Sequence, residues 1–200
     1  MSNNRFGSLP NWWFRSESDP LLSRLKSNTP GTGIAAMKCL LAISVLIDFY
    51  SRSAEISLTA FEEITGLSRP MVVKGLSVLE SNGVIEVDRG LHTNRYELTV
   101  QRSDAKWAKV PLGTIRKNLK SISNRGIAPF IALKLYITML SFRMNNKQTV
   151  KIAHITLRDH TGVQPAQVRS GLDVLYSHSL IHLMPREDRD INEYVILGIQ

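Results

Sequence analysis

Apolar residues in the first half of the chain follow a helical spacing before they give way to short extended runs. Between residues 34 and 49 they recur every three or four positions, which predicts a helix. An extended segment is predicted at Glu55–Leu58. Thr59 is then placed to cap a second helix over Ala60–Thr65, which Gly66 would end. The first helix is defined by Ile34, Met37, Leu40, Leu41, Val45, Leu46 and Phe49.

A third helix and a hairpin are predicted next. Val72, Leu76 and Leu79 stand at i, i+4 and i+7, so they form one apolar stripe, and Pro70 is tolerated in the first turn of a helix. The predicted elements are a helix from its cap at Ser68 to about Ser81, a stop at Asn82-Gly83, a strand at Val84–Val87, a loop containing Gly90 and a strand at Arg95–Val100.

The same pattern occurs twice. Thr65–Val87 aligns with Thr161–Leu183 at a constant offset of 96, with nine of 23 positions identical. The same offset pairs Met37–Ala42 with Leu133–Thr138, and both segments lie inside apolar helical patterns. We infer that the chain is a duplication of one module.

The order helix, short strand, helix, tight turn, helix and hairpin is that of the winged-helix superfamily. The run Gly66–Val87 (GLSRPMVVKGLSVLESNGVIEV) resembles it, because a glycine turn there precedes the recognition helix and a leucine-to-valine-isoleucine run leads into the wing. Tyr96 and Tyr194 occupy matching places in the second wing strand. The second copy ends at Leu180–Leu183, a loop at Pro185–Asn192 and Glu193–Leu197.

The resemblance covers roughly residues 32–100 and 127–198. It implies a mainly α fold with small β-hairpin wings (α+β), built from two tandem winged-helix domains. The expected organisation is an aromatic and basic extension at 1–31, domain 1 at 32–100, a basic linker at 101–126 that leads into the first helix of domain 2, and domain 2 at 127–200.

Two glycines stand within the predicted third helices, Gly75 and Gly171. A glycine inside a helix costs about 1 kcal/mol relative to alanine. We expect both to permit a close crossing of the second helix over the third rather than to bind phosphate.

The net charge of +8 is unevenly distributed and suggests a polyanionic partner. Residues 101–126 carry seven basic groups and one acidic group, so this short segment holds most of the surplus. It is either a solvated linker or a segment that follows phosphates. Helically spaced apolar residues from Leu112 to Ile122 predict that its second half opens domain 2 with a basic outer face. The candidate phosphate contacts here are Lys109, Arg116, Lys117 and Lys120.

A recognition helix reads base edges from its N-terminal half. Arg69 is suited to guanine, and Lys74 to a base or a phosphate, unless both are ordinary solvated residues. In the second copy Gln164 or Gln167 is suited to adenine. The remaining candidates are Ser68, Met71 and Ser77 on the first helix, Arg89, Asn94 and Arg95 in the first wing, and Arg169 and Ser170 on the second helix.

The two copies are expected to have diverged in function. Asp173 replaces Ser77, and the second wing, Arg186 to Asp190, is acidic overall and would repel phosphate. The first copy is therefore predicted to be the better major-groove reader. The second either binds DNA more weakly or forms a dimerisation surface.

Other classes of function are not indicated. The chain has neither a Walker A sequence nor GxGxxG, so we expect no enzyme activity and no cofactor. His178 and His182 lack a third ligand, so no metal site is expected, and Cys39 is expected in the core. One cysteine and no signal-like or membrane-spanning segment favour a cytoplasmic protein without a membrane partner. The Trp12-Trp13-Phe14 cluster either packs internally or docks on a partner.

Three roles remain. Tandem winged helices joined by a basic segment resemble plasmid replication initiators, and the Gly66–Val87 run also looks like the N-terminal domain of phage replication proteins. A transcriptional regulator fits equally well. The third is a protein–protein scaffold like the winged-helix subunits of chromosome-condensation complexes, which the basic linker disfavours. We expect a non-catalytic protein that binds double-stranded DNA, with a second copy or a replication or transcription protein as further candidate partners.

Overall fold

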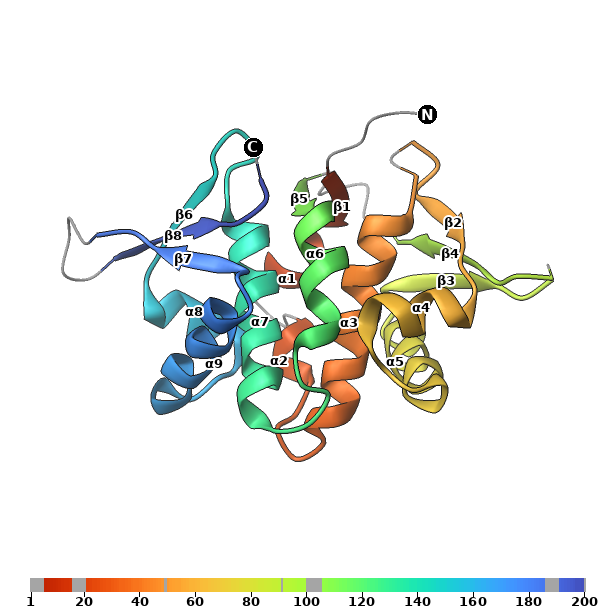
Figure 1. Ribbon diagram of the computed structural model, residues 1–200, viewed down its shortest axis with the longest axis horizontal. Coiled ribbons are helices and arrows are strands. Elements are labelled where there is room, and N and C mark those ends of the chain that lie inside the picture. The colour runs from red at the N-terminus through yellow and green to blue at the C-terminus, as the bar shows by residue number, and fades with distance from the viewer. Residues whose placement is uncertain are drawn as a thin grey trace.

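The computed structural model describes residues 6–15, 21–48, 50–90, 92–99, 106–185 and 191–199. The fold mixes α-helices with three small antiparallel sheets (Figure 1). The expected contributions of Phe49, Arg186 and Arg189 lie outside the described residues. The elements up to residue 98 are β1 (Phe6–Pro10), α1 (Trp12–Arg15), α2 (Leu21–Arg24), α3 (Pro30–Leu46), β2 (Ser53–Glu55), α4 (Leu58–Thr65), α5 (Arg69–Ser81), β3 (Ile85–Asp88) and β4 (Arg95–Leu98). Those that follow are β5 (Trp107–Pro111), α6 (Leu112–Asn118), the 3-10 helix η1 (Leu119–Ser121), α7 (Ile127–Phe142), β6 (Thr149–Ile152), α8 (His154–Thr161), α9 (Pro165–Ser177), β7 (Ile181–Leu183) and β8 (Asn192–Ile196).

The two halves of the chain contain the same series of elements. The series α3, β2, α4, α5, β3, β4 recurs as α7, β6, α8, α9, β7, β8, and the strand orders β2-β4-β3 and β6-β8-β7 correspond. The strand registers also match, since Ala54 faces Tyr96 and Val150 faces Tyr194. We call these series the first unit and the second unit. In Figure 1 they lie side by side, with the two hairpins pointing away from each other.

The local boundaries differ from the predicted ones at the second helix. The cap of α4 is Ser57 rather than Thr59: the Ser57 hydroxyl accepts a hydrogen bond from the Ala60 amide at 3.1 Å. The preceding strand ends at Glu55 because Ile56 turns into the core, where it is 4% exposed. The extended segment therefore lies earlier than predicted, and the helix begins two residues sooner.

A threonine and a glycine end the second helix of each unit, which explains why both residues recur in the repeat. The Thr65 hydroxyl donates to the Phe61 carbonyl, and it accepts from the Leu67 amide at 3.2 Å. Gly66 then adopts φ 66°, the left-handed conformation that favours glycine. Thr161 and Gly162 repeat this arrangement, with φ 64° at the glycine.

The mid-helix glycines serve close helix packing, as expected, but with a different partner. A Cβ on Gly75 would lie 2.6 Å from the carbonyl carbon of Ala35, in α3. A Cβ on Gly171 would lie 2.6 Å from the Cγ2 atom of Ile131, in α7. The long first helix of each unit therefore crosses the third helix, and the prediction that the second helix does so is wrong.

The helices ahead of each unit pack on the opposite unit. We call β1, α1 and α2 the first arm, and β5, α6 and η1 the second arm. The helices α1 and α2 contact α7 and α8, and α6 and η1 contact α3 and α4, whereas the strand β1 packs on α3 and the strand β5 on both α7 and α3. The expected opening helix of domain 2 is therefore present as α6 but lies against the first unit. In Figure 1, α6 lies in front of the central helices and α1 and α2 lie behind them.

A two-stranded sheet joins the arms near the middle of the molecule. β1 and β5 pair antiparallel, with Phe6 opposite Pro111 and Pro10 opposite Trp107. Together with the contact between α3 and α7, this pairing relates the two units by an approximate two-fold axis. Trp13 and Phe14 are 3% and 0% exposed, so the aromatic cluster packs internally, and one continuous core extends through both units.

Candidate nucleic-acid interface

The helix α5 presents a polar face that no described segment of the chain covers. Ser68, Arg69, Lys74 and Ser77 are exposed, and Met71 is half-buried. Within the described part of the chain, the side chains of Arg69 and Lys74 make no hydrogen bond or ion pair. The opposite face carries the apolar stripe into the core. The face predicted to read DNA is therefore accessible along its N-terminal half.

One residue of that face was missed by the sequence argument. Val73 lies between Val72 and Lys74 and is 51% exposed, whereas Val72 is fully buried. Its position next to the apolar stripe gave no signal that would separate it from core residues. An exposed valine on this helix is suited to contact with a thymine methyl group.

The second arm brings part of the basic segment to the turn before α5. A Cβ on Gly66 would lie 3.0 Å from the Lys120 carbonyl oxygen, so η1 lies directly against the turn. The Asn124 side-chain amide donates to the Gly66 carbonyl at 2.6 Å. Lys117 and Lys120 are exposed. This geometry places Lys120 close to the start of the candidate reading helix.

The other basic residues predicted in that segment are engaged within the molecule. The Arg116 guanidinium donates to the Val45 carbonyl at 3.3 Å. The Lys109 ammonium lies 4.9 Å from the centre of the Phe6 ring. The structure thus brings Lys120 to the α5 surface, while Arg116 and Lys109 contact α3 and β1.

A buried lysine connects the end of α4 to the segment that directly follows η1. The Lys38 ammonium is fully buried and donates to the carbonyls of Thr65 and Ile122 and to the Asn124 side chain, at 2.8, 2.6 and 2.7 Å. These acceptors use all three of its protons. Thr65 is the last residue of α4, where a cation is favoured by the helix dipole. We call this arrangement the lysine clamp.

The second unit repeats the clamp. Lys134 is 3% exposed and donates to the carbonyls of Leu25 and Thr161, each at 2.8 Å, and its ammonium lies 4.7 Å from the Phe130 ring centre. Burial lowers the pKa of Lys38 and of Lys134 to about 8. The sequence argument missed both because each lysine only interrupts an apolar helix.

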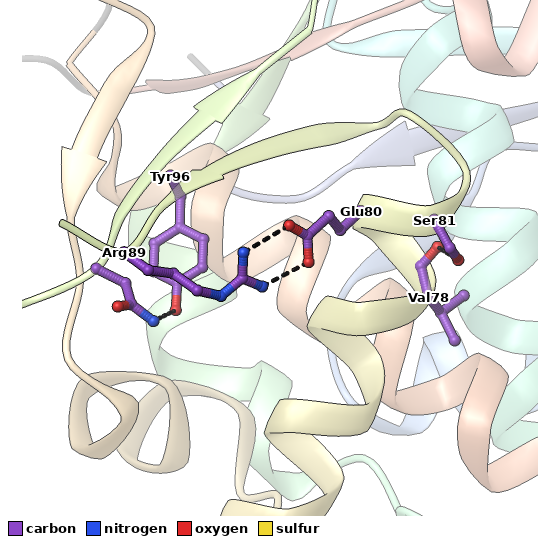
Figure 2. Close-up of polar contacts among 6 residues, drawn as sticks. Val78, Glu80, Ser81, Arg89 and Tyr96 are labelled. Atoms are coloured by element: carbon purple, nitrogen blue, oxygen red, sulfur yellow. Dashed lines mark hydrogen bonds and ion pairs between the residues drawn. The ribbon is translucent and has the colours of Figure 1, made fainter.

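The cations predicted in the first wing lie at the β3–β4 hairpin and are held by intramolecular partners. The Arg89 guanidinium donates to both carboxylate oxygens of Glu80, at 2.7 and 2.6 Å (Figure 2). This hydrogen bonding lowers the pKa of Glu80. Arg95 donates to the Ser53 hydroxyl at 3.1 and 2.8 Å, and Asn94 donates to the Tyr96 hydroxyl at 3.4 Å. The β3–β4 hairpin is thereby fastened to α5 through Glu80.

The second unit presents the corresponding helix α9. Gln164 and Arg169 are exposed, Gln167 is half-buried, and the Ser170 hydroxyl donates to the Gln167 carbonyl at 2.9 Å. At the other end of α9, the His178 ring contacts the Ser121 hydroxyl at 2.9 Å. The second arm therefore lies between the turn of the first unit and the end of α9.

No group of three or more candidate metal ligands occurs within the described ranges. None of the helices in those ranges combines the length and apolar character that a bilayer span requires. Neither a protein-family model nor a curated protein matches the chain.

Proposed function

We propose that the chain is a non-catalytic protein that binds a specific site in double-stranded DNA through two winged-helix domains. The series of helix, strand, helix, turn, helix and hairpin in each unit supports this assignment. The single observation that carries the proposal is the exposed face of α5, where Arg69 and Lys74 are uncommitted to any described residue. Side chains in such a position are available to base edges and phosphates.

The approximate two-fold axis gives this proposal a definite form. Helix-turn-helix dimers read half-sites about one turn of DNA apart, and the symmetry of the site mirrors the symmetry of the protein. One chain here carries α5 and α9 in that inverted relation. The proposed site therefore consists of two half-sites in opposite orientation that a single chain occupies. The two half-sites should differ in base sequence, because the positions of Arg69 and Lys74 on α5 are occupied by Pro165 and Ser170 on α9.

The process served is proposed as transcription regulation or as replication initiation of a plasmid or other mobile element. Both require the same DNA-reading surface. A protein partner for the second unit is favoured by one observation, the exposed apolar residues Leu183, Met184 and Ile191 at its hairpin. The partner that binds this surface would be a second copy of the chain or a replication or transcription protein. The same surface would also suit the alternative function, a protein–protein scaffold.

The test begins with duplexes selected from a random pool by the wild-type protein. On a selected duplex, Arg69→Ala should lower affinity by about 1–3 kcal/mol, which is roughly 5- to 150-fold, while leaving binding to unrelated duplexes largely intact. The matched control is Lys147→Ala, which removes one exposed positive charge from the loop between α7 and β6. In Figure 1 that loop lies at the opposite end of the molecule from α5.

Fluorescence anisotropy measures both variants. Equal affinity of Arg69→Ala and Lys147→Ala for the selected duplex would remove α5 from the interface. Failure of the wild type to bind any duplex at low salt would overturn DNA binding and favour the scaffold.

A further inference from the structure

A groove of about 440 Å³ opens in the second unit between α9, the start of α8 and the hairpin. Small-molecule sites commonly measure about 300–1,000 Å³ and combine apolar walls with a few convergent polar groups. Figure 1 shows these elements together at the outer end of the second unit. The lining residues used below are His154, Arg169, Leu172, Asp173, Tyr176 and Tyr194.

The first unit provides an internal comparison, because the same elements there form a different surface. At the equivalent positions, Leu58 replaces His154 and Val73 replaces Arg169. Glu80 replaces Tyr176, and its ion pair with Arg89 ties the hairpin to the helix (Figure 2). The residues that maintain the fold have been kept in both units, as the pairs Leu76 and Leu172 or Tyr96 and Tyr194 show. The polar lining is therefore a property of the second unit and is not needed to form the fold.

Two opposite charges in the groove do not neutralise each other. Arg169 and Asp173 are four residues apart on α9, a spacing at which side chains are neighbours on a helix. Both line the groove and both are exposed, yet neither side chain has a hydrogen bond or ion pair with any described residue. Neither charge is therefore committed to a partner within the described ranges, and together they suit a ligand that offers a negative group to one and hydrogen-bond donors to the other.

Aromatic and polar groups complete the lining. Tyr176 is half-buried one turn beyond Leu172, with Asp173 beside it; burial, and then the Asp173 carboxylate, raises its pKa. The Tyr194 ring is buried, and its hydroxyl contacts the His154 ring nitrogen at 3.1 Å. The groove thus offers an aromatic ring with an apolar neighbour, a cation and an acceptor-only carboxylate within one small volume.

We propose that this groove binds a guanine nucleotide. A guanidinium is the side chain best matched to phosphate oxygens, which assigns the phosphate to Arg169. A carboxylate only accepts hydrogen bonds, so Asp173 selects a base whose edge donates them. Guanine has two adjacent N–H donors on that edge, whereas adenine has one amino group beside an acceptor. Tyr176 provides the ring on which a base stacks.

The nucleotide has two sources that share this chemistry, a free mononucleotide and an unpaired guanosine in a DNA strand. The proposal stands apart from duplex recognition, because nucleotide binding is measured without duplex DNA. Calorimetric titration of the full chain with GMP, guanosine and AMP tests the ligand class. A short single strand containing one guanine, titrated in the same way and in competition with GMP, distinguishes the sources.

The wild type should bind GMP saturably and about tenfold more tightly than guanosine or AMP. Arg169→Gln should remove the difference between GMP and guanosine, and Asp173→Asn should remove the difference between GMP and AMP. The matched control is Lys147→Gln, which removes an exposed positive charge from the loop between α7 and β6 and should leave GMP affinity unchanged. Circular dichroism melting checks that every variant is folded.

Each outcome decides the proposal. Tighter binding of the single strand than of GMP, weakened by Asp173→Asn, identifies the strand as the occupant, whereas binding of GMP alone identifies the free nucleotide. Absence of saturable binding by both probes, or affinities that neither groove variant changes, would overturn the nucleotide site. Duplex binding by the same protein preparation, and its sensitivity to Arg69→Ala, shows separately whether the proposed DNA-binding function holds.

Discussion

Replacing Gly75 by alanine should destabilise the protein although alanine is the better helix former. The substitution gains about 1 kcal/mol of helix propensity. The added Cβ, however, would lie 2.6 and 2.7 Å from the carbonyl carbon and oxygen of Ala35, and 3.0 Å from the Ala36 amide nitrogen. These are backbone atoms of a buried helix, so α3 and α5 must separate. Overpacking typically costs about 1–3 kcal/mol, and a clash with backbone atoms belongs at the upper end of that range. After the gain in helix propensity is subtracted, we expect a net loss of about 2 kcal/mol.

Two other glycines serve as controls. A Cβ on Gly171 would meet mainly the side-chain ends of Ile131 and Leu135, which can rotate away, so Gly171→Ala should cost less than Gly75→Ala. Gly113 lies in α6 with nothing within 4 Å of an added Cβ. Gly113→Ala should therefore stabilise the protein by up to about 1 kcal/mol.

Thermal unfolding followed by circular dichroism measures the series. For a chain of this size, 1 kcal/mol corresponds to roughly 2–4 °C in Tm, so Gly75→Ala should lower Tm by about 4–8 °C. Urea titration provides the free energies independently. If Gly75→Ala melts at or above the temperature of Gly113→Ala, the close crossing of α3 and α5 is not what requires glycine at this position.

Three further predictions concern charged residues. Because the folded-state pKa of Lys38 is about 8, below its usual value of 10.5, the unfolded chain binds more protons at this group between these values, so Lys38 by itself should add roughly 2–3 kcal/mol to the free energy of unfolding from pH 8 towards 10.5. Burial raises the pKa of the neighbouring Cys39 thiol to about 12, which opposes this rise above pH 9, so the quantity to compare in urea titrations is the difference in pH dependence between the wild type and Lys38→Met. Neutralising Lys117 and Lys120 together should reduce the slope of log affinity against log salt by up to about two units on any duplex, and an unchanged slope would exclude phosphate contacts at η1. Glu80→Gln should free Arg89 and strengthen duplex binding of any sequence, with little effect on Tm because exposed ion pairs contribute about 0–1 kcal/mol; weaker binding would show that the wing must stay fastened to α5.

The helices and the duplication were predictable because they depend on local rules. The apolar stripe from Val72 to Leu79 and the Thr65-Gly66 stop each act within a few residues of the chain, and α5 spans the range predicted for it. The cap of α4 was misplaced because Ser57 and Thr59 are both acceptable caps by composition. Only the inward turn of Ile56 selects Ser57.

The arrangement of the arms and the state of the charges could not be predicted from the sequence. The apolar residues Ile115 and Leu119 only require burial, and a pattern of spacing does not say against which unit. A lysine inside an apolar helix, such as Lys38, has no sequence signal for the three acceptors that come from distant segments. Arg89 looked available to phosphate because Glu80, its partner, lies nine residues away across a turn.

The exchanged arms also bear on how such a chain can diversify. Each unit completes its core with a segment from the other side, which is the arrangement that fusing two subunits of an arm-exchanged homodimer would leave. In a homodimer every substitution appears twice, so the third helices of both halves must change together. Within one chain the halves are free to differ, as Arg169 opposite Val73 and Tyr176 opposite Glu80 show. The molecule is in effect an obligate heterodimer with fixed stoichiometry, in which the surface of one half can change while that of the other is kept.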